Sequence, residues 1–204
     1  MFRRLSIKQI IFFTIFSIFN IQSTDVQESK VEYMATCILP YCWTKNGTTL
    51  VLLGKERRRF GYAWFDFCGT RDEKDEGPLE TAIRELNEET AYQLKLLPTE
   101  NLIKFFVNYK INPRNKQIDG TVVHFLLPIQ YINPEVIKKA VSTGKYKHVE
   151  KREWKWIKAQ DLLDNKVKDL HFYDLFEYKL KIPEFKKLLE EVIKEGKTRI
   201  KSKL

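Results

Sequence analysis

Residues 69–92 read GTRDEKDEGPLETAIRELNEETAY, and this stretch decides the fold. Its second half predicts an amphipathic helix, because Pro78 suits a first helical position and apolar side chains then recur at helical spacing, at Leu79, Ala82, Ile83 and Leu86. With about 100° between successive residues, a second stripe lies roughly 120° from the apolar one and holds Glu85, Glu88 and Glu89. The stretch therefore predicts a helix that buries one face and presents three carboxylates along one exposed edge.

This carboxylate edge is unfavourable by itself. Like charges at these spacings destabilise a helix by roughly 0.2–0.5 kcal/mol per pair, and locally only Arg84 offsets them. A divalent cation would reverse the sign, and Mg²⁺ and Mn²⁺ prefer carboxylate and water oxygens. Such an ion can also bridge phosphate oxygens and activate an attacking water. We therefore expect Mg²⁺ or Mn²⁺ as the cofactor.

The loop before the helix has a matching composition. Gly69 allows the backbone to approach a metal or phosphate closely, and Glu76 can pair with Arg84 and so hold the loop on the helix. A glutamate-rich helix face alone is usually solvated surface. The full pattern is more specific, because six such positions at fixed spacing occur by chance in a chain of this length with odds on the order of 10⁻⁵.

The pattern resembles the Nudix box, which is a Gly, five residues, a Glu, seven residues, then Arg-Glu-aliphatic-x-Glu-Glu-x-Gly-aliphatic. Residues Arg84 to Glu89 match it without change. There are three departures: one extra residue between Gly69 and Glu76, Ala91 in place of the terminal Gly, and Tyr92 in place of the aliphatic. The loop insertion leaves the roles of Gly69 and Glu76 open.

The resemblance implies an α+β protein with the Nudix fold, an α/β/α sandwich around a mixed β-sheet. It implies metal-dependent hydrolysis of a diphosphate linkage in a nucleoside diphosphate joined to another group, such as a dinucleoside polyphosphate, a nucleotide sugar or capped RNA. Nucleic acid would then be a partner only as substrate, and no partner protein or oligomeric state follows. The implied metal site comprises Glu85, Glu88, Glu89 and Gly69, with one of these glutamates or a later loop glutamate as base, and with Arg84 and Glu76 orienting the site.

Two other classes of function are compatible with such a fold. A non-catalytic Nudix-fold protein would bind a nucleotide or a partner without turnover, and an isomerase of isoprenoid diphosphates would change the reaction. The complete set of Glu85, Glu88 and Glu89 favours hydrolysis over both.

Elements on both sides of the box support a layered domain. Apolar runs at residues 33–43 and 50–53 predict two strands, and Asn46-Gly47 between them predicts a hairpin turn with positive φ at both positions. A basic turn is expected at residues 55–59. The remaining elements expected are strands at residues 102–109, 121–127 and 154–157, a short helix capped by Asn133, and a C-terminal amphipathic helix around residues 185–193.

Three residues are weaker candidates for substrate binding. Tyr109 follows the box at a distance where relatives that act on diadenosine polyphosphates carry an aromatic residue. Trp154 can stack on a base, although aromatic residues at strand spacing more often belong to a core. Glu150 and Glu153 lie where family members supply an additional loop carboxylate, with an ordinary charged surface as the alternative for both and Glu153 as our candidate.

The two ends of the chain differ from the middle. Residues 1–23 carry Arg3 and Arg4 before a short apolar run, which predicts a signal peptide and export, with an uncleaved membrane anchor or a buried helix of a cytosolic protein as alternatives. We assign residues 24–31 to a linker, 32–196 to the Nudix hydrolase domain and 197–204 to a basic tail. The formal net charge of +9 suits a polyanionic partner.

The three cysteines do not settle the compartment. Cys37 and Cys42 are expected on one strand, about 17 Å apart and on opposite faces, which is beyond disulfide reach. We therefore expect buried free thiols. Cys68 borders the loop of the box.

Overall fold

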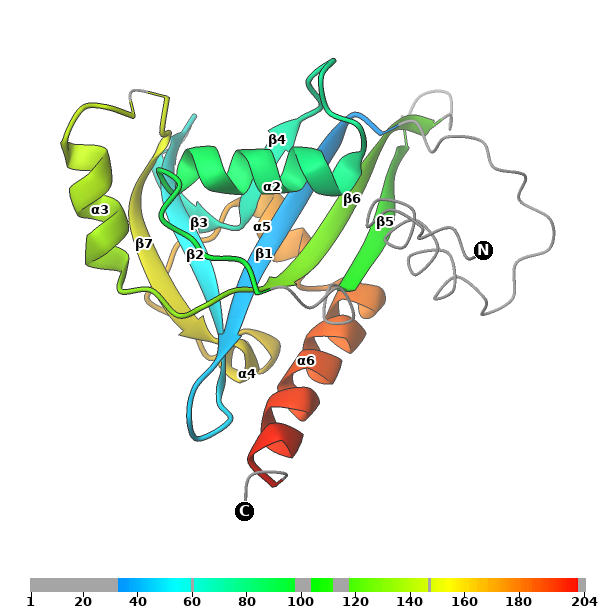
Figure 1. Ribbon diagram of the computed structural model, residues 1–204. Coiled ribbons are helices and arrows are strands. Elements are labelled where there is room, and N and C mark those ends of the chain that lie inside the picture. The colour runs from blue at the N-terminus through cyan, green and yellow to red at the C-terminus, as the bar shows by residue number, and fades with distance from the viewer. Residues whose placement is uncertain (1–32, 60, 98–103, 112–117, 147, 202–204) are drawn as a thin grey trace, which may run out of the picture.

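Strand β1 (Ala35–Trp43) is the centre of a mixed sheet in the computed structural model, which describes residues 33–59, 61–97, 104–111, 118–146 and 148–201 (Figure 1). Its seven inner residues are buried, as expected of a strand covered on both faces. β1 pairs in parallel with β6 (Ile118–Pro128) and antiparallel with both β2 (Thr49–Arg58) and β4 (Phe67–Thr70). The sheet is therefore mixed, as predicted.

The other strands extend this sheet on both sides. Its main path runs β3-β2-β1-β6-β5, where β3 is Gly61–Phe65 and β5 is Lys104–Ile111. β7 (Lys151–Lys158) pairs antiparallel with β2. β2 therefore lies among β1, β3 and β7, and its middle residues, Val51 to Gly54, are buried.

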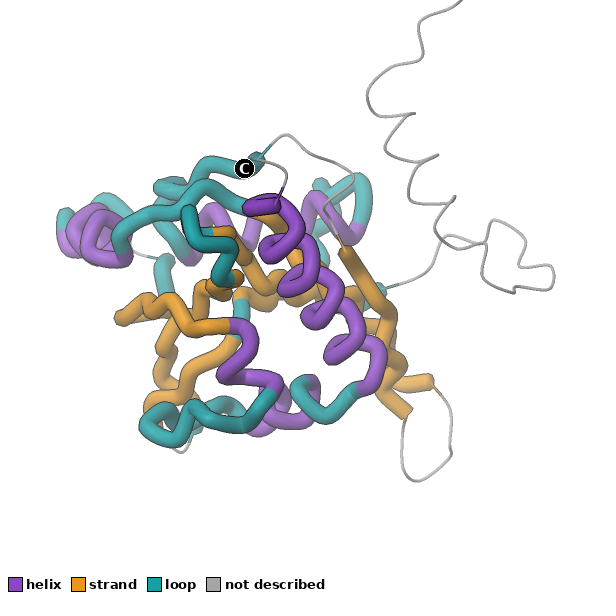
Figure 2. The backbone as a smooth tube through the Cα atoms, turned by 90° about the horizontal axis from the view of Figure 1, so that it is seen from below, coloured by secondary structure: helices purple, strands orange, loops and turns teal. Residues whose placement is uncertain are grey.

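Helices cover both faces of the sheet, and Figures 1 and 2 show α6 (Pro183–Lys201) on the face opposite α2 (Pro78–Glu89). Neighbouring strand residues point into different cores because side chains alternate along a strand. Ile38 and Leu52 pack with Leu86 of α2, whereas Leu39 and Leu53 pack with Leu189 of α6. Two cores separated by one sheet confirm the predicted α/β/α sandwich.

Shorter helices complete the two layers. α3 (Pro134–Ser142) begins as the sequence predicts, with the Asn133 side chain accepting the backbone N–H of Glu135 at 3.1 Å. α4 (Ala159–Leu163) and α5 (Asp174–Lys179) contribute Leu162 and Phe176 to the core beside α6. α6 continues through Lys201, so the basic residues assigned to the tail begin inside this helix.

The predicted signal peptide at residues 1–23 and the predicted linker at residues 24–31 lie outside the described residues. Within the part of the chain that the structure describes, no helix is both long enough and apolar enough to cross a membrane.

The turn between β1 and β2 differs from the prediction. Gly47 has a φ of 72°, but Asn46 is not among the described residues with positive φ. The N–H of Gly47 donates to the Thr44 carbonyl at 2.9 Å, and the N–H of Thr44 donates to the Thr48 carbonyl at 2.9 Å. The loop is therefore a four-residue turn that ends in a left-handed glycine, and the expectation of positive φ at both positions was wrong.

β2 is longer than the sequence suggested. The expected basic turn at residues 55–59 is strand through Arg58, because Lys55 to Arg58 pair with β3, and Gly61 opposes Arg58. Alternation along this strand then turns Glu56 inward, where it is buried.

The expectation of free thiols was wrong for Cys37. β1 and β4 are antiparallel neighbours in which Cys37 lies directly opposite Cys68, and the two form a disulfide. The partner is on a different strand, so the separation of Cys37 and Cys42 within β1 did not bear on it. Cys42 is a buried free thiol, and burial raises its pKa to about 12.

Gly47→Val should destabilise the domain, because a β-branched residue fits poorly at positive φ. We expect a loss of about 1–2 kcal/mol and a melting temperature lower by roughly 2–8 °C in thermal unfolding. Lys45→Ala, at an exposed position of the same turn, is the control and should melt like the wild type. Equal melting temperatures for all three proteins would show that the turn conformation does not matter for stability.

Candidate active site

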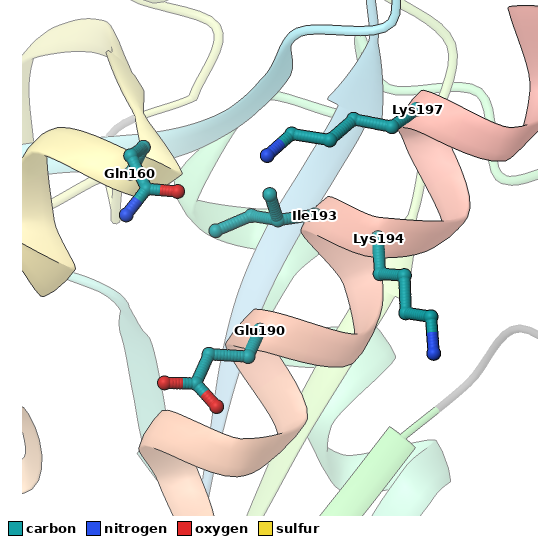
Figure 3. A pocket seen from close by; sticks show the side chains of 5 residues that line it. All are labelled: Gln160, Glu190, Ile193, Lys194 and Lys197. Carbon is teal, nitrogen blue, oxygen red and sulfur yellow. The ribbon is translucent and has the colours of Figure 1, made fainter.

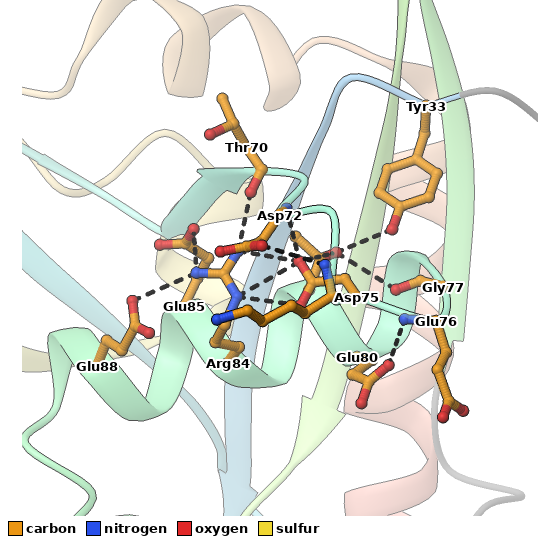
Figure 4. A network of polar contacts seen from close by, with 12 residues as sticks. Tyr33, Thr70, Asp72, Asp75, Glu76, Gly77, Glu80, Arg84, Glu85 and Glu88 are labelled. Atoms are coloured by element: carbon orange, nitrogen blue, oxygen red, sulfur yellow. Dashed lines mark hydrogen bonds and ion pairs between the residues drawn. The ribbon is translucent and has the colours of Figure 1, made fainter.

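Arg84 joins the loop before α2 to the helix itself (Figure 4). Its guanidinium donates to both carboxylate oxygens of Asp75, with Nε 3.1 Å from Oδ1 and Nη2 3.0 Å from Oδ2. Nη2 also donates to the Thr70 carbonyl at 2.9 Å, at the end of β4. Such two-pronged pairs fix orientation as well as distance. One side chain thus holds the strand end, the loop and the helix together.

Asp75, and not Glu76, is the loop acid that pairs with Arg84. Asp75 is buried and also accepts the Thr81 hydroxyl at 2.8 Å and the Asp72 N–H at 2.9 Å. The Glu76 side chain is exposed, and its backbone N–H donates to Glu80. The predicted Glu76–Arg84 pairing is therefore corrected: Asp75 keeps the five-residue spacing from Gly69, and the extra residue falls after the acid.

These hydrogen bonds also set the ionisation of the pair. The Arg84 guanidinium is the largest influence on Asp75 and lowers its carboxyl pKa to about 2. In return, the hydrogen bond to Asp75 raises the pKa of Arg84 above its already high value. Both groups are therefore charged at neutral pH.

Gly69 makes room for Glu85. A Cβ atom on Gly69 would lie 1.8 Å from Cδ and 2.0 Å from Oε1 of Glu85, so any other residue here would displace that carboxylate. Arg84 Nη1 donates to Glu85 Oε1 at 2.8 Å and to Glu88 Oε2 at 3.3 Å. Burial raises the pKa of Glu85, and Arg84 opposes the shift.

Glu89 faces inward and meets carboxylates from two other elements. It is buried at 7% exposure, whereas the sequence suggested an exposed edge shared with Glu85 and Glu88. Its carboxylate lies near those of Glu56 on β2 and Glu150 just before β7, and one oxygen of each lies within 4.8 Å of the others. Three carboxylates at this separation form a candidate site for a hard divalent cation.

Burial dominates the protonation of this carboxylate cluster. It raises the pKa of Glu89 to about 8, with Lys151 opposing and Glu56 and Glu85 reinforcing the shift. Burial likewise raises the pKa of Glu56. A bound cation favours the ionised form of a carboxylate, so cation binding here would release protons.

Sequence reasoning missed Asp75, Glu56 and Lys151, and it preferred Glu153 to Glu150. Glu153 projects outward and pairs with Lys55 at 2.8 Å on the surface. Trp154 is 6% exposed and packs in the core beneath α2. Tyr109 lies in β5 opposite Thr121, and its side chain is outside what the structure describes.

Two other features lie away from this site. A pocket between α4 and α6 is lined by Gln160, Glu190, Ile193, Lys194 and Lys197 (Figure 3), and it belongs to the layer opposite α2. A second group of potential ligands, Cys37, Asp66 and His124, is already engaged, because Cys37 is in the disulfide and Asp66 pairs with Lys179. Neither feature adds a side chain to the carboxylate cluster.

The fold and the site together define an α/β/α protein in which the helix α2 carries a cluster of carboxylates beside the loop that precedes it. The family model of the NUDIX domain matches residues 36–176, which is more than half of the chain. The chain therefore belongs to the Nudix family and is a hydrolase acting on pyrophosphate bonds. No curated protein sequence matches it significantly.

Solved structures with a similar fold include an Ap4A hydrolase of C. elegans, in a binary complex, at 16% identity with a TM-score of 0.43, covering 83% of this chain and 98% of that one. The Nudix hydrolase RenU of M. smegmatis has 19% identity and a TM-score of 0.46, and the match covers 80% of this chain and 87% of RenU. The NUDIX domain of Shewanella oneidensis NrtR, complexed with ADP ribose, has 17% identity and a TM-score of 0.45. The match covers 87% of this chain and 94% of the NrtR domain. Membership rests on the family model and not on these likenesses.

Asp75→Asn should destabilise the protein, because the variant loses the charge that Arg84 pairs with. The folded-state pKa is depressed, so Asp75 contributes stability above the unfolded-state pKa, and that contribution is lost as the pH falls from about 4 through about 2. At pH 7 we expect a loss of about 2 kcal/mol in urea unfolding. The difference from the wild type should shrink below pH 4.

Glu76→Gln is the matched comparison, because the two acids are neighbours and only one pairs with Arg84. It should change the unfolding free energy by no more than about 0.5 kcal/mol. A larger loss for Glu76→Gln than for Asp75→Asn would restore Glu76 to the role that the sequence suggested.

Proposed function

We propose that this Nudix hydrolase uses Mg²⁺ or Mn²⁺ to hydrolyse a diphosphate linkage in a nucleoside diphosphate joined to a second group. The observation that carries the proposal is the convergence of Glu89 with Glu56 and Glu150, next to an intact Arg84-Glu85 pair. The residues fit a hard cation: Glu89 Oε2 is buried without a hydrogen-bond partner and has only an ion-pair contact with Lys151 at 3.5 Å, and the absence of a side chain at Gly69 lets the Glu85 carboxylate lie against the loop. When bound, the ion would neutralise charge on the phosphates and activate water.

Different residues of the site would hold the ion and act as the general base. Glu89 and Glu150 would hold the ion, because one oxygen of each lies within 4.8 Å of the other. Glu85 and Glu88 lie on the same helix, and Arg84 holds both in place through Nη1. The general base would then be Glu85 or Glu88, the two helix carboxylates that do not hold the ion, and it would accept a proton from the attacking water.

A nucleotide substrate suits the charge of the chain. The net charge of +9 attracts polyanions, and Arg57, Arg59 and Arg71 are exposed near the ends of β2 and β4. Dinucleoside polyphosphates, nucleotide sugars and capped RNA all present the required linkage. Metal-dependent phosphate chemistry by the purified protein separates this proposal from a nucleotide-binding protein without turnover.

We also propose that the chain is exported. Arg3, Arg4 and the short apolar run that follows have the pattern of a signal peptide. The Cys37–Cys68 disulfide supports an oxidising compartment, because disulfides persist outside the reducing cytosol. An uncleaved N-terminal anchor remains the alternative.

Glu88→Gln and Glu89→Gln should each collapse activity, since both keep the size of the side chain and remove the charge. We expect metal-dependent turnover on the best of a panel of nucleotide substrates to fall by about 10²–10⁴. Glu177→Gln on α5, exposed and in the opposite layer, is the control and should keep wild-type turnover. Full turnover in both box variants would remove these residues from the active site.

N-terminal sequencing of the protein from its native host tests export. A mature chain beginning near Thr24 or Asp25 is expected, because Ser23 ends the segment with signal-peptide character. Membrane-bound protein with an intact N-terminus would favour the anchor, whereas soluble protein that retains Met1 would rule out export.

A further inference from the structure

We propose that the Lys151 side chain fills the inner side of the carboxylate cluster as a counter-ion, so that the protein binds one divalent cation and not two. This inference rests on the proposed metal-dependent function. It adds a residue that neither the box nor the sequence pattern indicates.

The Lys151 ammonium lies between two buried carboxylates. Its Nζ is 3.5 Å from Glu56 Oε2 and 3.5 Å from Glu89 Oε2, and its side chain has no solvent exposure. A fully buried lysine is rare unless it is paired. Here the pairing partners are two of the three carboxylates of the candidate cation site.

The protein provides a specific space for this lysine. Gly54 lies beside its stem, and a Cβ atom there would be 1.9 Å from Lys151 Cδ and 2.7 Å from Cε. The ammonium is 3.6 Å from the centre of the Phe65 ring and 5.1 Å from that of Phe67. Aromatic faces attract a cation that has lost its water. Strands β2, β3 and β4 thus build a cation-binding compartment around one side chain.

Glu56 is committed to protein cations. Its Oε1 is 3.2 Å from Nε of Arg58, and its Oε2 is within 3.5 Å of both Lys151 Nζ and Arg58 Nη2. With both oxygens occupied, Glu56 is a counter-ion for the two basic residues. The carboxylates left for a divalent cation are Glu89 and Glu150, of which Glu150 is exposed.

The charges agree with Glu56 as the counter-ion of the basic residues and with Glu89 and Glu150 as the ligands of one divalent cation. When ionised, as cation binding requires, Glu56, Glu89 and Glu150 supply three negative charges, and Lys151 and Arg58 supply two positive charges. One divalent cation is sufficient to neutralise what remains. A second ion on the inner side would lie against the ammonium, where the low dielectric strengthens repulsion between cations. Lys151 therefore acts as a positioning residue, because it leaves only the solvent-facing side of the cluster open to metal.

The test is the number of Mn²⁺ ions bound per folded chain without substrate, measured by titration calorimetry and by electron paramagnetic resonance of free Mn²⁺. The wild type should bind one. Lys151→Met keeps the stem and removes the charge, which leaves Glu89 Oε2 without its cation and Glu56 Oε2 with Arg58 alone, so this variant should bind two. Lys155→Met, an exposed lysine on the same strand, should bind one.

The double variant Lys151→Met with Glu56→Gln removes one charge of each sign. It should fold even where the single variant does not, and it should bind one ion because the inner side again lacks a free carboxylate. Two ions on the wild type, two on the folded double variant, or one on a folded Lys151→Met protein would each overturn the inference. A wild type that binds no Mn²⁺ and shows no metal-dependent turnover would instead contradict the proposed function.

Discussion

The guanidinium of Arg84 is the contact on which the rest of the site depends. It reaches Asp75 in the loop, Glu85 and Glu88 on the helix and the carbonyl of Thr70 at the end of β4. Without it, three carboxylates would repel one another across a short distance, and the loop would have no charged anchor on α2. Because Asp75 is also hydrogen-bonded to Thr81, whose hydroxyl meets that of Tyr33, the same network extends to the start of β1. Apolar packing of Leu86 holds α2 on the sheet, and this polar network fixes which edge of the helix faces the loop.

Much of the architecture followed from local patterns. The apolar stripe of Leu79, Ala82 and Leu86 predicted α2, and the capping side chain of Asn133 predicted the start of α3. The pattern could not locate the loop insertion. The family spacing is satisfied by Asp75 when counted from Gly69 and by Glu76 when counted from Arg84. Only the folded loop decides between them, because burial and hydrogen bonds favour the shorter acid.

The residues that the sequence analysis missed take their positions from pairing between strands that are distant in the sequence. Glu56 lies among Lys55, Arg57 and Arg58, which resembles an exposed basic turn until β3 and β7 pair on either side of β2. Glu150 and Glu153 are equally acidic in the sequence, and the register of β7 turns only Glu150 toward α2. Cys37 and Cys68 meet because β4 returns beside β1. In each case the side chain can be placed only when the pairing of the strands is known.

The disulfide has a consequence that extends beyond β1 and β4. It closes a loop with a sequence separation of 31, and that loop contains all of β2 and β3, including Gly54, Glu56 and Phe65. By the chain-entropy account, a crosslink over a loop of this length removes about 3–4 kcal/mol of conformational freedom from the unfolded protein. The strands that surround Lys151 therefore lie within a crosslinked loop, and whether that crosslink is present depends on the oxidation state of the surroundings. Reduction of this bond in a thiol-rich medium would therefore lower the stability of the fold that holds Lys151 in place, although neither cysteine belongs to the carboxylate cluster.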